Sequence, residues 1–444
     1  MDIYITNRHN KELPLLAGIT VFFIFFIYNL TAQLFLFVLG LTALFVCVFI
    51  FSFEQLFLLC ILLLPNLGII KVIGNDTAWF GYFMLLVGLK YILCEKIFIF
   101  PWLLLHAVSC LLTICLYVEF SLFTTLVRNI VFFVFVFSIF KRGKAFQTLE
   151  YQKSILVYYL IGLSLYVCFG LLFWAISAKE IFNGAFSGIA GGRNYFASII
   201  AHGIGLFLLF LFQDNEKYFI LKFAMLMILL FAGFLSASRT FLLSLIFIVL
   251  EFLVLIIKPK NIIKGFCMIF FALVVLLVFW DYFVPAIRKV INRFTQENAV
   301  GGNGRFALWK AYLELTFSRL ERAFLGNGLA INYQDVIRVE GYPFQVEHNT
   351  FIQAISTVGL CGTITLFMIY VGMYKIIVPN KKKFDIAVWM PLCAGLLFYM
   401  SISSLYSDRF NGLILVSFIA INYFSETKNK SKLSPLPLSK RKEL

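Results

Sequence analysis

Long apolar stretches alternate with short polar segments along this 444-residue chain. A helix of about 20 apolar residues crosses the hydrocarbon core of a bilayer. The pattern places such spans near residues 13–28, 34–53, 56–73, 78–93, 98–118, 121–140, 154–177, 195–212, 218–235, 240–257, 263–281, 350–377, 385–405 and 410–424. We therefore expect an all-α polytopic membrane protein with about 12–14 transmembrane helices.

One long polar interruption, from Phe283 to Glu347, separates two of the apolar runs. Within it, Arg305 to Leu325 has helical spacing with glycines near both ends, which predicts an amphipathic helix that lies on the membrane surface or over a cavity. The expected apolar stripe of that helix is Leu308, Trp309, Tyr312, Leu315, Leu320 and Phe324. The chain then divides into transmembrane helices (1–281), a large extracytoplasmic loop (282–349), further transmembrane helices (350–424) and a basic cytoplasmic tail (425–444).

Composition excludes a soluble globule, because 62% of the residues are hydrophobic and only 13% are charged. The net charge of +15 suits cytoplasmic loops, which collect Lys and Arg, better than a nucleic-acid surface. One orientation puts every basic cluster on the same side as the basic tail, so both termini are expected in the cytoplasm. The nine cysteines lie in or beside apolar runs without a CxxC motif, which favours packing thiols and no metal site.

That orientation brings a second set of polar residues to the outer face, where the positive-inside rule disfavours arginine. The set is Arg193, Arg239, Arg305, His348, Asp408 and Arg409. Guanidinium groups bind phosphate through paired hydrogen bonds and keep their charge where water is scarce. A histidine titrates near neutral pH and accepts a proton from a hydroxyl. Together these groups suit transfer of a glycan from a pyrophosphate carrier to an acceptor hydroxyl.

Three segments on this face resemble the O-antigen ligase and polymerase superfamily of bacterial membrane glycosyltransferases. The first two are Gly191-Gly192-Arg193-Asn194 and Ser236-Ala237-Ser238-Arg239-Thr240. The third is a block that starts at Gly304-Arg305, passes through Gly326-Asn327-Gly328 and His348-Asn349-Thr350, and ends at Val358-Gly359-Leu360-Cys361-Gly362. The likeness covers about residues 185–375, and it rests on the order and spacing of these pieces.

The resemblance implies a metal-independent transferase of the GT-C kind that needs no cofactor and inverts the anomeric centre. The enzyme would lie in the bacterial cytoplasmic (inner) membrane with its active site facing the periplasm or exterior. Its expected substrates are an undecaprenyl-pyrophosphate-linked oligosaccharide and an acceptor glycan. Membrane lipids, a chain-length regulator and a flippase are the further partners that it implies, and nucleic acid is not among them.

The resemblance also assigns roles to individual residues. His348 would orient or deprotonate the acceptor hydroxyl, while Arg193 and Arg239 would bind the pyrophosphate. Arg305 would support the loop or the phosphate. The remaining supporting residues would be Glu347, Asn349 and Asp408.

Two functions remain open within the superfamily, and two alternative functions lie outside it. A polymerase joins lipid-linked repeat units, whereas a ligase moves the finished glycan onto lipid A core. Polymerases serve O-antigen, capsule and exopolysaccharide systems alike, which favours a polymerase. A flippase is disfavoured because the chain shows no internal repeat. A metal-dependent glycosyltransferase is disfavoured because the first outer loop, Asn29 to Gln33, contains no acidic residue.

Overall fold

The structure is a computed structural model that describes residues 12–71, 79–117, 120–177, 192–213, 218–278, 280–295, 305–328, 347–379, 385–403 and 405–433, together with Phe186 and Gly188. The described chain is helical and contains no strand. In chain order its elements are α1 (Glu12–Thr31), α2 (Leu34–Ile50), α3 (Phe53–Leu63), η2 (Leu64–Ile69), α4 (Trp79–Cys94), α5 (Pro101–Tyr117), α6 (Phe120–Arg142), η3 (Ala145–Gln147), α7 (Leu149–Ser177), α8 (Arg193–Gln213), α9 (Phe219–Leu235), α10 (Arg239–Ile256), η4 (Pro259–Asn261), α11 (Ile262–Val278), α12 (Trp280–Thr295), α13 (Arg305–Phe317), α14 (Leu320–Leu325), α16 (Thr350–Ile377), α17 (Ile386–Leu396), η7 (Leu397–Met400) and α18 (Asp408–Leu433).

Six of the described helices are long and apolar enough to cross a membrane: α1, α6, α7, α8, α10 and α16. Shorter apolar helices accompany them, and every predicted span overlaps one or two of the helices given above. Large apolar side chains such as Phe49 and Phe266 remain exposed on the outside, as expected for helices that face lipid. The prediction of an all-α polytopic membrane protein is confirmed.

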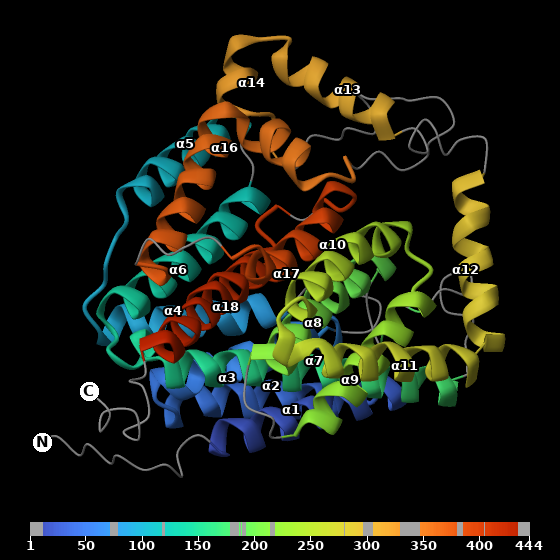
Figure 1. The fold of residues 1–444 in the computed structure, drawn as a ribbon. Helices are drawn as coiled ribbons and strands as arrows, with labels where there is room; N and C mark the ends of the chain where they lie inside the picture. Colours follow the sequence, from blue (N-terminus) through green and yellow to red (C-terminus); the bar gives the residue numbers. More distant parts are fainter. Residues whose placement is uncertain are drawn as a thin grey trace, which may run out of the picture.

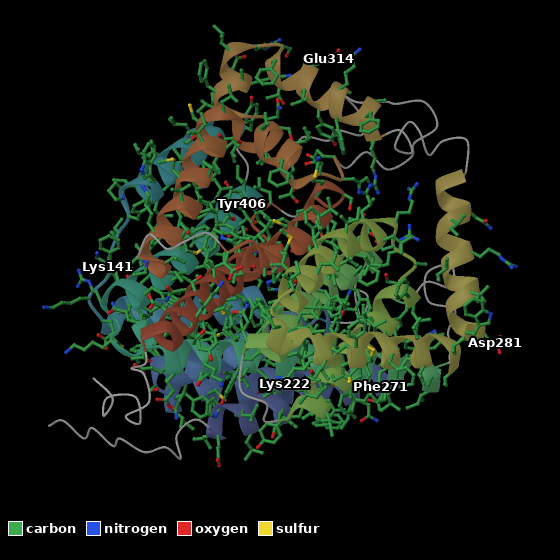
Figure 2. The ribbon with its side chains drawn as sticks, viewed as in Figure 1. Lys141, Lys222, Phe271, Asp281, Glu314 and Tyr406 are labelled. Carbon is green, nitrogen blue, oxygen red and sulfur yellow. The ribbon has the colours of Figure 1, made fainter. Side chains whose placement is uncertain are left out.

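Two short helices from the predicted loop cover one end of the bundle. Figure 1 shows α13 and α14 lying across the ends of α16 and α5, with α12 standing at the edge. The contacts agree, because α14 packs on α16 and α5, and α13 packs on α16. Figure 2 labels Glu314 on this outer layer and Tyr406 inside the bundle beneath it.

The prediction of a single helix is wrong: the segment forms two helices, and residues of the expected apolar stripe are buried only in the first. Leu308 and Tyr312 are buried as expected, but Leu320 and Phe324 are exposed. The reason is a break: Arg319 has an extended backbone, with φ −142° and ψ 148°, and separates α13 from α14. Because α14 restarts in a new direction, the stripe that one continuous helix would have produced does not continue.

A break inside α16 holds this outer layer in place. Gly359 has φ +65°, a left-handed conformation that interrupts the helix and releases carbonyl groups upstream. Two of these carbonyls accept backbone hydrogen bonds from the segment after α14: Ser356 O from Asn327 N over 2.7 Å, and Thr357 O from Gly328 N over 2.9 Å. The two glycine-containing motifs, far apart in sequence, therefore form one joint.

We predict that Gly359→Ala loosens this joint. A Cβ at position 359 would meet the backbone of Phe324 and Gly326, and alanine disfavours the left-handed conformation. The variant should lower unfolding stability by about 1–3 kcal/mol, seen as a lower thermal midpoint in detergent. Ile364→Ala, on the exposed face of the same helix, is the control. Equal thermal midpoints for the two variants would show that this joint does not depend on Gly359.

Candidate functional site

Hydrogen bonds join the first turns of α8 and α10. Ser238, directly before α10, donates its hydroxyl to Oδ1 of Asn194 in α8 over 3.0 Å. Thr240 in the first turn of α10 lies with its hydroxyl oxygen 3.3 Å from that of Ser401, directly after η7. The first two segments that resemble the superfamily therefore lie side by side, next to the chain that leads into α18.

A buried carboxylate connects this pair to the end of the predicted loop. Glu347 is only 4% exposed. Its Oε1 accepts from the Ser356 hydroxyl over 3.3 Å, and its Oε2 accepts from the Ser403 hydroxyl over 3.2 Å. Tyr195 of α8 donates its hydroxyl to the Ser403 carbonyl over 2.9 Å. Glu347 thus bridges the broken part of α16 to the segment that contacts α8.

His348 occupies a strained turn between this carboxylate and α16. Its φ is +48°, a left-handed conformation that a residue with a side chain adopts at a cost of about 1–3 kcal/mol. Asn349 follows and caps α16 by accepting from the amides of Phe351 and Ile352. Thr350 donates its hydroxyl to the Ile402 carbonyl over 2.6 Å. The turn is therefore held on both sides by fixed contacts.

A residue with the same left-handed backbone precedes two other helices of the site, α10 and α18. Ala237 has φ +47° and stands two residues before the first residue of α10. Tyr406 has φ +62° and stands two residues before the first residue of α18. His348 has the same spacing to α16. A left-handed residue reverses the chain sharply, so each helix begins directly beneath a tight turn.

The helix starts differ in how their first amides are satisfied. Ser407 caps α18 by accepting from the Phe410 amide over 3.1 Å, and Asn349 caps α16. In contrast, α8 follows Gly192, which has no side chain, and the hydroxyl of Ser238 makes no capping bond to α10. The starts of α8 and α10 thus lack a side-chain cap from the preceding residue, which suits them to an anion.

Arginine begins both of these helices. Arg193 is the first residue of α8, and Arg239 is the first residue of α10. Arg305 is the first described residue of α13. A helix start carries a partial positive charge and favours acidic residues, so a cation there is unfavourable without an anion. The arginines add positive charge to helix starts that already favour an anion.

The first turns of α13 lie against the strained turn at His348. The indole Nε1 of Trp309 donates to the Glu347 carbonyl over 2.7 Å. Burial lowers the pKa of the His348 imidazole, and the positive charge of Arg305 lowers it further. His348 is half-buried, and the lowered pKa favours the neutral imidazole, the form that accepts a proton.

Asp408, a supporting residue from the sequence, has its nearest neighbours in other helices. Its carboxylate lies against Gly81 of α4, beside the positive charge of Arg128 in α6. The next residue is the one that reaches the cluster: the Arg409 guanidinium lies over the Tyr195 ring, 5.1 Å from its centroid.

The structure thus brings most of the predicted residues to one end of the bundle. Arg193, Arg239, Glu347, His348 and Asn349 belong to linked segments, with Arg305 within electrostatic reach of His348. Other members of the cluster escaped the sequence reasoning because their contacts join distant segments. These are Tyr195, Ser356 and Ser403. Arg409, which the sequence already placed on the outer face, reaches the cluster through the Tyr195 ring.

Comparison with known proteins gives one match. The family model described as O-antigen ligase matches residues 224–367. This range contains Arg239, Arg305 and His348, whereas Arg193 and Arg409 lie outside it. No curated protein and no solved structure matched the chain.

We predict that Glu347→Gln stabilises the protein at high pH relative to low pH. Burial raises the pKa of the Glu347 carboxyl above that of the unfolded chain, against smaller lowering effects from its own backbone amide and the two serine hydroxyls. Ionisation therefore weakens folding as pH rises through the unfolded and then the folded pKa. The thermal midpoint of the variant, relative to wild type, should rise between pH 4 and pH 8. Glu314→Gln, at an exposed position on α13, should show no such trend. A difference in thermal midpoint between Glu347→Gln and wild type that stays the same at every pH would refute the effect of burial on the Glu347 pKa.

Proposed function

Because residues 224–367 match the family model described as O-antigen ligase, we propose that this protein belongs to the O-antigen ligase and polymerase superfamily and is a polysaccharide polymerase. It transfers a glycan from an undecaprenyl-pyrophosphate-linked donor to a sugar hydroxyl of the acceptor. The reaction takes place at the outer face of the cytoplasmic membrane, and both termini lie in the cytoplasm. The observation that carries this proposal is the joining of the Arg193 and Arg239 helix starts next to the strained His348 turn.

The pyrophosphate of the donor binds at the starts of α8 and α10. Each start offers backbone amides, the positive end of a helix dipole and an arginine. Arginine forms paired hydrogen bonds with phosphate oxygens. The same groups stabilise the negative charge that develops as the pyrophosphate leaves the sugar. No metal ion is needed for this role in the proposed mechanism.

His348 acts on the acceptor. Its neutral imidazole accepts the proton of the acceptor hydroxyl while the hydroxyl oxygen attacks the anomeric carbon of the donor sugar. The bond between that carbon and the pyrophosphate oxygen breaks, and undecaprenyl pyrophosphate leaves with the bonding electron pair. Attack opposite the leaving group inverts the anomeric centre. The contacts of Glu347 and Asn349 fix the backbone on both sides of His348, so these residues act by positioning it.

A ligase that transfers the glycan to lipid A core is the second candidate. The observation that favours it is the matched family model, whose description is O-antigen ligase. Both activities use the same donor and differ in the acceptor. The polymerase and the ligase are distinguished by the glycan that accumulates when the site residues are replaced.

We predict that loss of the site abolishes chain growth. His348→Asn removes the imidazole but tolerates the left-handed backbone, so folding is preserved. Arg193→Ala and Arg239→Ala remove the phosphate ligands. Each variant should lower polymer formation by at least about 100-fold, because positioned proton transfer contributes about 10²–10⁴. Arg142→Ala, exposed at the end of α6, is the control.

Gel separation of the surface polysaccharide measures this outcome in cells with equal membrane expression. A polymerase without its site leaves single repeat units in place of a ladder. A ligase without its site leaves long lipid-linked polymer and no surface glycan. A flippase would leave no lipid-linked units at the outer face, and wild-type ladders from the His348 and both arginine variants would refute the site.

We predict that Arg305→Gln shifts the pH dependence of transfer. Removing the positive charge beside His348 raises the pKa of the imidazole toward its usual value. Because the neutral form is active, the acid limb of the rate profile should move to higher pH, and the loss of rate should be greater at pH 6 than at pH 8. Arg319→Gln, exposed between α13 and α14, should leave the limb unchanged. The same fractional loss at every pH would show that Arg305 does not act through His348.

A further inference from the structure

A cavity with polar and apolar lining lies far from the candidate site, where α6, α7, α16 and α18 meet. Its volume is about 690 Å³, within the range of about 300–1,000 Å³ that is typical of small-molecule sites. Thr350, the first residue of α16, belongs to the candidate site, whereas Lys375 in its last turn lines the cavity. The two sites are therefore separated by the length of α16.

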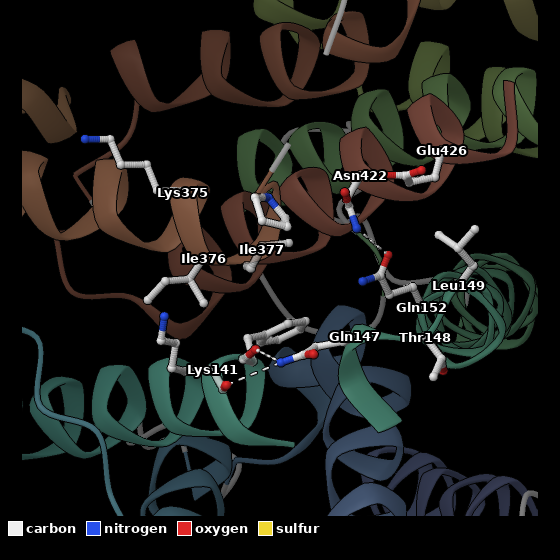
Figure 3. A pocket seen from close by; sticks show the side chains of 12 residues that line it. Lys141, Gln147, Thr148, Leu149, Gln152, Lys375, Ile376, Ile377, Asn422 and Glu426 are labelled. Carbon is white, nitrogen blue, oxygen red and sulfur yellow. Dashed lines mark hydrogen bonds between the residues drawn. The ribbon is translucent and has the colours of Figure 1, made fainter. Parts of the chain in front are cut away.

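Side-chain amides form a preorganised floor. Gln152 of α7 and Asn422 of α18 are 1% and 6% exposed, and Nδ2 of Asn422 donates to Oε1 of Gln152 over 2.9 Å. Gln147 donates through Nε2 to the carbonyls of Phe140 and Lys141, which end α6. Figure 3 shows these contacts within the cavity wall. Hydrogen bonds within the protein therefore hold these polar side chains in place.

Positive charge dominates the rim. Lys141 and Lys375, in the last turns of α6 and α16, line the cavity and are both exposed. Within the described part of the chain, neither amine forms an ion pair or a hydrogen bond. Glu426 is the one carboxylate in the lining, and Figure 3 shows it on the side of the cavity opposite both lysines. Neither amine thus has a carboxylate of the lining on its side of the cavity.

The start of α7 adds to the positive electrostatic potential of the cavity. Thr148 precedes α7 and lines the cavity, as does Leu149, the first residue of the helix. The Thr148 hydroxyl accepts from the Tyr151 amide over 3.3 Å, which caps one of the first amides. The positive end of a 29-residue helix therefore points to the cavity, on the same side of the molecule as the lysines.

We propose that this cavity binds a phosphate group, carried either by an anionic phospholipid headgroup or by a soluble phosphate ester. The ammonium groups of Lys141 and Lys375 hold the phosphate oxygens, and the amide floor receives the polar remainder of the ligand. Its position at the ends of apolar helices is the depth at which lipid headgroups lie. Binding ties α16 to α6 and α7 at the end away from His348.

The test measures binding to purified full-length protein in maltoside detergent, by native mass spectrometry and by thermal midpoint. The probes are phosphatidylglycerol and glycerol 3-phosphate. The variant K141Q/K375Q removes both amines. K96Q/K144Q removes two exposed lysines outside the cavity and is matched in charge. In the absence of probe, both double variants should show the wild-type midpoint.

Binding to K141Q/K375Q should be at least about tenfold weaker than to K96Q/K144Q, because charge-assisted hydrogen bonds are the stronger kind. Binding of phosphatidylglycerol alone identifies a lipid headgroup as the source, and binding of glycerol 3-phosphate identifies a soluble ester. Either result supports the site. The proposal is overturned if neither probe binds wild type, or if the two double variants bind equally. Transfer activity is not the readout, so this result is independent of the proposed polymerase function.

Discussion

The amide groups in the first turn of a helix need partners, and water is scarce inside a membrane protein. At one end of this bundle, side chains meet that need for α16 and α18 through Asn349 and Ser407. The residues before α8 and α10 provide no such cap, and each of these helices begins with an arginine. Each of these helix starts thus combines backbone amides that lack a side-chain cap with a guanidinium group, and both kinds of donor favour an anion. The proposed pyrophosphate site rests on this combination.

The break at Gly359 links the anion site to the outer layer. By interrupting α16, it releases the carbonyls of Ser356 and Thr357 to the segment after α14. The hydroxyl of Ser356 also donates to Glu347, directly before His348. One local backbone change therefore fixes the covering helices and the histidine turn together. Such shared support keeps a strained residue in a defined position, as catalytic geometry requires.

Sequence reasoning succeeded where the signal was local or periodic. Apolar run length predicted the helices, and charge asymmetry selected the arginines for attention. It failed at the exposed Leu320, because nothing in the periodicity indicated the break at Arg319. It also missed Tyr195 and Ser403, whose roles depend on contacts between segments far apart in the chain. Polar residues of this kind are recognised only when the packing of the helices brings them together.

The most direct test of the central claim is equilibrium binding of undecaprenyl pyrophosphate to purified protein in lipid nanodiscs. The account predicts that Arg193→Ala and Arg239→Ala each weaken binding at least about tenfold, since a hydrogen bond to a charged group contributes about 1.5–3 kcal/mol. His348→Asn should bind as wild type does, because the imidazole acts on the acceptor. Wild-type affinity in both arginine variants would contradict a pyrophosphate site at the starts of α8 and α10.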